Sequence, residues 1–398
     1  MRILIVANAP FVKTGYGVQT NIFAPRLMQA GHPSAVLSYY GLEGGILNYN
    51  GLMLYPKGIH PYGMDVVAVS AANFQADCVF TLMDSWVVLP QNFNNFPWIA
   101  WYPIDHDTMP PKVREAITQA YARIAMSKHG VEVTKQAGLD CFYIPHGVDT
   151  NVFKPYDKIE ARKALGFPED AFLVGTVAMN KGIPSRKCLP QLLQAFANFK
   201  KRHTNAIYYM HTQEGVGKDG LGGVNIPECC YLMGLEYGKD VILPNPHMMM
   251  LGFPDDFMAR MYSALDVHLL VSTGEGFGIP IIEAQACGCP VIVGGWTAMP
   301  ELVHSGRIID KKDADPIWTG IAAYQYQPRI RAIELALEAE RKNPSPRERA
   351  RKGMVDNYDA QLVFEKHFLP TIQQIENNMK TDNARFQKGL DDLAREGK

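Results

Sequence analysis

Short apolar segments recur along residues 1–150, and stretches with helical spacing separate them. One such helix is predicted over Val18–Gln29, just before Gly31. The apolar segments carry few polar residues on either face, which is typical of strands that helices cover on both sides. This alternation predicts a doubly wound parallel sheet in residues 1–150. The strands that we expect in it are Arg2–Ala7, Ser34–Tyr39, Cys78–Leu82, Trp98–Tyr102, Ile124–Met126 and Cys141–Ile144.

A second series of the same kind begins after the turn-rich segment Pro145–Pro155, which we interpret as an interdomain linker. It includes a predicted helix over Leu189–Phe199. The series predicts a second doubly wound domain in residues 151–359. Ligands bind at the carboxyl ends of the strands in such domains. A cleft between the two domains is therefore the expected site. Its predicted strands are Phe172–Val177, Ala206–His211, Val241–Leu243, Val267–Val271, Val291–Val293 and Arg307–Ile309.

Residues 360–376 show helical spacing of apolar side chains, and we expect this helix to pack back on the first domain. The apolar positions are Leu362, Val363, Phe368, Leu369, Ile372 and Ile375. Residues 377–398 are mostly polar and are predicted to form a tail that frays.

Composition narrows the function classes. The chain has 398 residues, of which 47% are hydrophobic and 20% charged, the profile of an ordinary globular protein. Its 39 basic and 40 acidic residues give a net charge of −1, which argues against a uniformly basic protein that wraps nucleic acid. Arg329–Lys352 is locally basic; a solvated pair of helices is the favoured interpretation, and an acidic partner such as nucleic acid is weakly supported.

The seven cysteines are odd in number and spread over a long chain, and the close pairs Cys229–Cys230 and Cys287–Cys289 lack the two-residue spacer of zinc sites. They indicate plain thiols in a reducing compartment, so we expect a cytoplasmic protein with no metal site. The longest apolar runs fall short of the roughly 20 residues of a transmembrane helix. Met1–Pro10 is expected to be a first strand rather than a signal peptide.

The sharpest motif in the chain follows the predicted strand Val267–Val271 and reads STGEGFGIPIIEAQACGCPVI. Its loop glycines permit a tight turn and a close approach of the backbone to a ligand. Ile279–Ala286 is then predicted to be a helix whose free N–H groups and positive dipole end suit a diphosphate. The loop glycines are Gly274, Gly276 and Gly278.

Two carboxylates belong to this motif, Glu275 in the loop and Glu283 in the helix. Carboxylates accept hydrogen bonds from the vicinal hydroxyls of a sugar or a ribose. Taken by itself, a glutamate in an apolar helix is also compatible with a paired structural charge.

The frame EGFGIPIIEAQACGCPVI, from Glu275 through Glu283, closely resembles the signature of the family 4 retaining glycosyltransferases, which have the GT-B fold. The resemblance spans about residues 1–370. The other similar segments are ILIVANAPFVKTGYGVQT, AMSKHG, IPHGVDTNVFKP, YSALDVHLLVSTGEGFG and GGWTAMPELV. It implies two Rossmann-like domains that face a cleft.

The resemblance also implies roles for individual donor-binding residues. Glu283 is expected to hold the ribose hydroxyls of a nucleotide-sugar, and Glu275 the transferred sugar and its phosphate side. Backbone groups of Gly276, Phe277 and Gly278 are expected to assist Glu275. Gly15 and Gly17 are expected in a first-domain loop that approaches the donor phosphates and the acceptor.

Family members place an Arg and a Lys five positions apart after the first strand of the second domain, where they neutralise the diphosphate. In this sequence Asn180 occupies the usual Arg position and is expected to contact the donor. We therefore select Arg186 and Lys187 as the catalytic cations, with Lys181 as the alternative. The leaving diphosphate needs this positive charge because no metal is predicted.

Two loops of the first domain supply further candidates. Related enzymes carry a His near the transferred sugar, and His106, flanked by Asp105 and Asp107, is the corresponding residue. Asp84 and Trp86 follow another strand at the same edge, so we expect Asp84, Trp86 and Asp105 to contact the acceptor.

The function implied is transfer of a sugar, with retention at the anomeric carbon, from a UDP- or GDP-sugar to an acceptor hydroxyl, with no further cofactor. A glycan, a small molecule, a protein and a modified nucleobase in DNA all stay open as acceptors. A nucleotide-sugar epimerase or hydrolase of the same fold is one alternative. A non-catalytic nucleotide-sugar binder is another, and the altered loop at Asn180 is what supports it.

Overall fold

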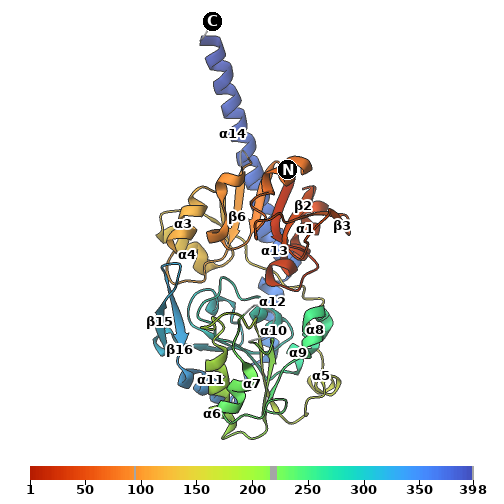
Figure 1. The fold of residues 1–398 in the computed structure, drawn as a ribbon, viewed down its shortest axis with the longest axis vertical. Helices are drawn as coiled ribbons and strands as arrows, with labels where there is room; N and C mark the ends of the chain where they lie inside the picture. The colour runs from red at the N-terminus through yellow and green to blue at the C-terminus, as the bar shows by residue number, and fades with distance from the viewer. Residues whose placement is uncertain (94–95, 216–221, 397–398) are drawn as a thin grey trace.

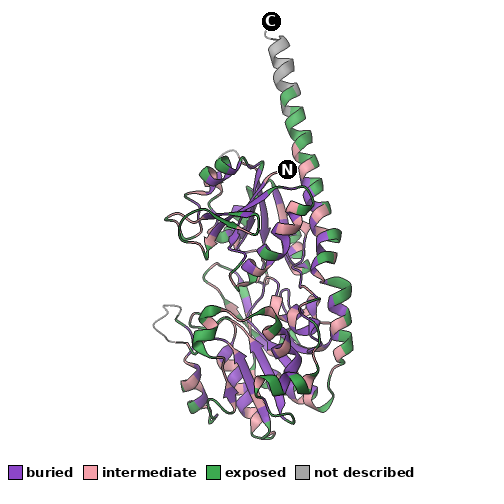
Figure 2. Cartoon of the chain, turned by 90° about the vertical axis from the view of Figure 1, so that its right-hand side faces the viewer, coloured by how far each residue is buried: buried purple, intermediate pink, exposed green. Residues whose placement is uncertain are grey.

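The computed structural model describes residues 1–93, 96–215 and 222–396. Within these residues, one half of the molecule is built on an eight-stranded sheet and the other on a six-stranded sheet, with a separate two-stranded hairpin (Figure 1). Figure 2 shows that buried residues concentrate in the strands of both halves, and exposed residues on the outer helices. This α/β architecture of two doubly wound domains is the predicted fold.

The first sheet has the strand order β3-β4-β2-β1-β5-β6-β7-β8, and all its neighbours are parallel except β3 and β4. Strands β5 and β6 are buried along their whole length, as apolar strands covered on both faces must be. The strands are β1 (Ile3–Asn8), β2 (Ser34–Tyr40), β3 (Leu47–Tyr49), β4 (Leu52–Pro56), β5 (Cys78–Leu82), β6 (Trp98–Tyr102), β7 (Ala122–Ala125) and β8 (Phe142–Tyr143). The helices are α1 (Gly15–Gln29), α2 (Val67–Phe74), α3 (Pro111–Thr118) and α4 (Lys128–Gln136), with short helices η1 (Ser85–Val87) and η2 (Pro90–Phe93).

The second sheet is parallel, with the order β11-β10-β9-β12-β13-β14. Its strands are β9 (Phe172–Val177), β10 (Ala206–His211), β11 (Val241–Ile242), β12 (Val267–Leu270), β13 (Val291–Gly294) and β14 (Gly306–Ile309), and the hairpin pairs β15 (Ala314–Trp318) with β16 (Tyr324–Pro328). The helices are α5 (Lys158–Leu165), α6 (Leu189–Lys200), α7 (Ile226–Leu232), α8 (Pro246–Leu251), α9 (Asp255–Ala264), α10 (Ile279–Ala286), α11 (Ile330–Lys342) and α12 (Arg347–Asn357), with η3 (Pro300–Leu302) and η4 (Lys311–Asp313).

The chain crosses between the two halves twice, and the crossings lie side by side. Val148, in the predicted linker, donates its N–H to Tyr358 O at 2.9 Å, and Ala360 N donates to Val148 O at 2.9 Å. After this return, α13 (Ala360–Val363), η5 (Phe364–Phe368) and α14 (Leu369–Glu396) follow. Phe368 stacks on Phe23 with a centroid separation of 4.7 Å, so the C-terminal segment packs on the first sheet's helices.

Three features differ from the sequence-based expectations. Gly15 and Gly17 do not lie in a loop: Thr14 caps α1 by accepting from Gly17 N, so both glycines belong to the first helical turn. The polar tail does not fray at Asn377, because α14 continues to Glu396 (Figure 1); residues 397–398 of that tail lie outside the described residues. The pair β3–β4 and the hairpin β15–β16 were not among the predicted strands; β3 has three residues, and β15 contains Pro316.

Candidate active site

The loop between β12 and α10 carries the glycine motif, and two of its glycines face the first domain at close range. A Cβ at Gly274 would collide with the carbonyl oxygen of Asp105, and one at Gly276 would collide with Pro103. Gly278 has φ +112°, a left-handed value at the residue that precedes α10, which favours glycine. The motif therefore needs glycine both for the local turn and for the approach of the two domains.

Arg186, Lys187 and Glu275 form a charged cluster beside this loop. Lys187 Nζ donates to Glu275 Oε1, and Arg186 Nη1 lies 3.6 Å from Glu275 Oε2 and donates to Gly274 O. Arg186 Nη1 also lies 3.8 Å from Asp105 Oδ2, so the guanidinium bridges the two domains. The structure thus brings the two selected cations to the predicted carboxylate.

Electrostatics favour the charged forms of Glu275 and Arg186, whereas burial and the Arg186 charge lower the pKa of Lys187. Burial raises the pKa of Glu275, but the charges of Lys187 and Arg186 outweigh it and hold that pKa below its ordinary value. Burial lowers the pKa of Arg186, whereas Glu275 and Asp105 raise it above the ordinary value. Arg186 and Lys187 thus place two cationic side chains beside the loop that precedes α10, where they face the carboxylates of Glu275 and Asp105.

Two helix N-termini meet at the same place. Gly15, at the start of α1, would place a Cβ 3.2 Å from the Cδ1 atom of Ile279 at the start of α10. The unpaired N–H groups and positive dipole ends of both helices therefore converge near the charged cluster. An anionic group such as a diphosphate is the ligand that this arrangement suits.

Glu283 lies in α10, where the hydroxyl of Tyr262 donates to its Oε2 at 2.9 Å. Burial, followed by the nearby charge of Asp255, raises the pKa of Glu283 to about 7, and the Tyr262 hydrogen bond and Lys13 only partly offset this. Lys13, from the first domain, pairs with Asp255 at 2.7 Å. Glu283 thus has no cationic partner of its own among the described residues, which fits a hydrogen-bond acceptor for hydroxyls better than a structural ion pair.

The loop Asp105–Asp107 leaves β6 and contacts the second domain. Asp105 Oδ1 lies 2.7 Å from His106 Nδ1, and His106 Nε2 lies 3.0 Å from Thr319 Oγ1 in the turn of the β15–β16 hairpin. Both ring nitrogens of His106 therefore have neighbours within the protein. Asp107 accepts from Lys311 Nζ at 2.6 Å and from the Tyr326 hydroxyl at 2.9 Å.

Asp84 follows β5 at the same edge of the first sheet, just before η1. Burial and the charge of Asp105 raise the pKa of Asp84 to about 6, and Arg186 partly offsets them. Tyr16, on the first turn of α1, has its pKa raised by burial and by the Asp84 charge. Trp86 is 45% exposed beside them, so carboxylates, a phenol and an indole gather on the first-domain side.

Asn180, predicted to contact the donor, has its side chain bonded within the protein. Its side-chain amide is buried; Nδ2 donates to Gln213 O and Val224 O, and Oδ1 accepts from Val224 N at 2.9 Å. These bonds hold two loop segments together and use both hydrogens of the amide nitrogen, so Nδ2 has none left for a ligand. Lys181, the alternative cation, is exposed, and its charge contributes to the field at Asp84.

Several contacts at the domain border involve residues that the sequence did not single out. Glu301, within the GGWTAMPELV segment, accepts from Lys128 N at 3.0 Å and from His129 N at 3.1 Å, and so satisfies the first N–H groups of α4. The others at this border are Lys311, Thr319, Gln325 and Tyr326. Within the second domain, Tyr262 was not singled out for its bond to Glu283. Glu301 and Tyr262 lie in quoted segments, whereas the other four are polar residues without a local signal.

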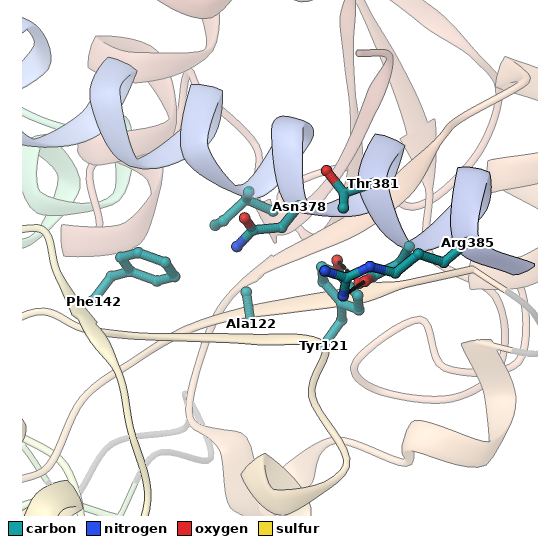
Figure 3. A pocket seen from close by; sticks show the side chains of 8 residues that line it. Tyr121, Ala122, Phe142, Asn378, Thr381 and Arg385 are labelled. Carbon is teal, nitrogen blue, oxygen red and sulfur yellow. Dashed lines mark hydrogen bonds and ion pairs between the residues drawn. The ribbon is translucent and has the colours of Figure 1, made fainter.

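A cavity of about 410 Å³ lies elsewhere, between α14 and the β7–β8 edge of the first sheet. Figure 3 shows Asn378, Thr381 and Arg385 of α14 on one side of it, and Tyr121, Ala122 and Phe142 on the other. Tyr121 directly precedes β7, so this cavity opens at the amino end of a strand. The carboxyl ends, where the candidate residues gather, are the sites that bind ligands in such sheets.

The basic segment Arg329–Lys352 forms α11 and α12 as predicted, and much of its charge is used inside the domain. Arg329 pairs with Asp315 at 2.6 Å, and Arg347 and Arg351 donate to main-chain carbonyl groups. This use favours a structural role for the segment over a nucleic-acid surface. No described helix is long and apolar enough to cross a membrane.

Comparison with known proteins agrees with the motifs. Residues 232–324 match the family model described as Glycosyl transferases group 1. A D-inositol 3-phosphate glycosyltransferase from Stackebrandtia nassauensis is 31% identical over 172 residues, which cover 42% of this chain and 37% of the relative. One from Acidothermus cellulolyticus is 30% identical over 178 residues, 43% of this chain and 37% of the relative. The matched part thus spans little more than a third of the length of these curated relatives.

Solved structures establish the fold. Sucrose-phosphate synthase from Thermosynechococcus elongatus superposes with a TM-score of 0.75 at 15% identity, covering 96% of this chain and 100% of that chain. HepE from Anabaena in complex with UDP-glucose gives a TM-score of 0.66 at 17% identity, with 96% and 100% coverage. The predicted GT-B fold is therefore confirmed, and residues 232–324 are similar to the predicted glycosyltransferase family.

Proposed function

We propose that this GT-B protein is a retaining glycosyltransferase that uses a nucleotide diphosphate-sugar and no bound metal. The observation that carries the proposal is the cluster of Arg186, Lys187 and Glu275 where the first turns of α1 and α10 meet. Two cationic side chains together with two helix N-termini can stabilise a leaving diphosphate.

The donor lies, in this proposal, along the loop that precedes α10. Glu283 accepts hydrogen bonds from the ribose hydroxyls, and Glu275 with the backbone of Gly276, Phe277 and Gly278 holds the transferred sugar and its phosphate side. UDP is the favoured nucleotide, because HepE from Anabaena, which shares the fold, was solved with UDP-glucose. GDP is the alternative.

The transfer forms the bond from the acceptor oxygen to the anomeric carbon on the same face from which the diphosphate oxygen departs. The acceptor proton passes to that departing oxygen, so no protein base is needed. Arg186 and Lys187 neutralise the charge that develops on the diphosphate. The His106 loop closes the sugar side against water.

The acceptor lies against Asp84, Trp86 and Asp105 and is a neutral polyhydroxyl compound. Two carboxylates near each other accept hydrogen bonds from hydroxyls and repel a phosphate. This differs from the phosphorylated acceptor named for the curated relatives, D-inositol 3-phosphate. We place the protein in the cytoplasm, since all seven cysteines are free thiols.

Calorimetric titration with UDP-glucose and GDP-glucose, without added metal, tests the donor site. Wild-type protein should bind one of them, and Glu283→Ala should bind neither, because the ribose loses its acceptor. Lys352→Met, an exposed change on α12, is the matched control and should bind as wild type does. Unchanged affinity in Glu283→Ala would remove Glu283 from the ribose role.

Product analysis then separates the three function classes. Wild-type protein with donor and a neutral polyol should give a glycoside of unchanged anomeric configuration. An epimerised nucleotide-sugar or free monosaccharide as the main product would favour the epimerase or hydrolase. Donor binding without any turnover across a panel of neutral and phosphorylated acceptors would favour the non-catalytic binder.

A further inference from the structure

The β15–β16 hairpin belongs to the second domain by sequence, but its contacts reach the first-domain loop Asp105–Asp107. Asp107 N donates to Tyr324 O at 2.8 Å, and Gln325 Nε2 donates to Asp105 O at 3.0 Å. Figure 1 shows the hairpin extending from the second half of the molecule towards the α3–α4 side of the first. With the contact between His106 and Thr319 described above, the hairpin holds all three residues of the loop.

The hairpin is also tied to the donor loop. Gln325 Oε1 accepts from Thr273 Oγ1 at 2.7 Å, and Tyr326 N donates to Thr273 O at 3.0 Å. Gln325 is only 4% exposed, so its amide links the glycine motif and the Asp105 carbonyl away from solvent. A displacement of the hairpin would therefore shift both the Asp105–Asp107 loop of the first domain and the glycine loop of the second.

From the hairpin turn a chain of polar contacts leads to the cationic cluster. The Thr319 hydroxyl donates to Ala323 O at 2.8 Å, which leaves its oxygen to accept from His106 Nε2. His106 Nδ1 lies beside Asp105, whose other carboxylate oxygen lies 3.8 Å from Arg186. The Thr319 hydroxyl and the Asp105 carboxylate thus hold the imidazole from opposite ring nitrogens.

We propose that Thr319 and Gln325 are positioning residues for sugar transfer, with Thr319 orienting the His106 ring and Gln325 fixing the Asp105 carbonyl against the glycine loop. The inference rests on the proposed transferase function. It assigns the hairpin a part in the reaction although no hairpin residue belongs to the family motifs. Neither residue contacts the cationic cluster directly; each acts through the Asp105–Asp107 loop.

The test compares Thr319→Val, which keeps the shape but removes the hydroxyl, with Thr319→Ser, which restores it. Asp315→Asn is the matched control, because Asp315 lies on the same hairpin, is exposed and pairs with Arg329 of its own domain. The first readout is the ring nitrogen resonances of His106 in protein labelled with ¹⁵N-histidine, assigned with His106→Gln. It needs no substrate.

We expect the His106 resonances to shift in Thr319→Val and to return to the wild-type positions in Thr319→Ser. With donor and acceptor present, kcat should fall about tenfold in Thr319→Val while KM for the donor stays unchanged, the pattern of a lost orientation rather than lost binding. Thr319→Ser should recover kcat, and Asp315→Asn should match wild type in both readouts.

Wild-type resonances and kcat in folded Thr319→Val would overturn the proposal, as would equal effects in Asp315→Asn. If Thr319→Val does not fold, Gln325→Leu is measured in the same way and is expected to shift His106 and lower kcat. A wild-type protein that binds no nucleotide-sugar would refute the transferase function instead, and the resonance shift would still test the positioning of His106.

Discussion

Replacing Lys187 with Met is the sharpest probe of the cationic cluster, because it removes one charge and keeps most of the aliphatic stem. Lys187 donates to Glu275, and their side chains are 17% and 8% exposed. The variant leaves a carboxylate buried with only Arg186, 3.6 Å away, as its cationic partner.

The expected cost follows from that burial. Removing one partner of a buried ion pair destabilises a protein by about 3–5 kcal/mol. Because Arg186 still offsets part of the Glu275 charge, we expect a value near the lower end, about 3 kcal/mol at pH 7. Lys181→Met, at an exposed lysine of the same segment, should change stability by less than about 0.5 kcal/mol.

The pH dependence has a definite sign. Lys187 and Arg186 hold the pKa of Glu275 below its ordinary value, so their stabilisation is present above the unfolded pKa of about 4.3 and is lost as the pH falls through the folded pKa. The difference between wild type and Lys187→Met should therefore be large at pH 7 and shrink below about pH 4.

Urea unfolding at several pH values measures this effect, and a double-mutant cycle with Glu275→Gln isolates the pair. The coupling between the two substitutions should be about 2 kcal/mol, since Glu275→Gln removes the charge that Lys187 neutralises. Additive effects, or a Lys187→Met cost that stays the same as the pH falls from 7 to well below 4, would refute the buried ion pair as the stabilising contact.

Three further outcomes follow from the geometry. Gly276→Ala should lower kcat/KM at least about tenfold by pushing Pro103 away, seen in steady-state kinetics, with unchanged far-UV circular dichroism confirming the fold. Donor affinity should rise between pH 6 and pH 8, because the pKa of Glu283 is about 7 and only its carboxylate form accepts hydrogen bonds from two hydroxyls. In calorimetry, the donor affinity of Glu283→Gln should not change over this pH range. Glu301→Gln should destabilise the protein by about 1 kcal/mol in thermal unfolding, because the carboxylate charge at the N-terminus of α4 is lost; an unchanged Tm would contradict this.

Local sequence leaves the role of some candidate site residues undecided. Asn180 was selected because it occupies the position of a family arginine, yet its amide is consumed by the main chain of two other segments. The five-position spacing between Arg and Lys that is typical of the family is absent. Here two adjacent residues, Arg186 and Lys187, both contact Glu275. Only the conformation of the whole 180–188 loop determines which cation faces the cluster.

The sequence by itself determined the strands that are buried on both faces, such as Cys78–Leu82 and Trp98–Tyr102, and the helix Ile279–Ala286 with its glycine loop. These elements follow from short-range patterns: an apolar run between turn residues, or glycines before helical spacing. Tertiary structure decided the β15–β16 hairpin, which contains Pro316 and has three of the five residues of β15 exposed. It is held in part by hydrogen bonds to Asp105–Asp107, about 200 residues earlier in the chain. The contact between Thr319 and His106 exists only when the two domains have folded together.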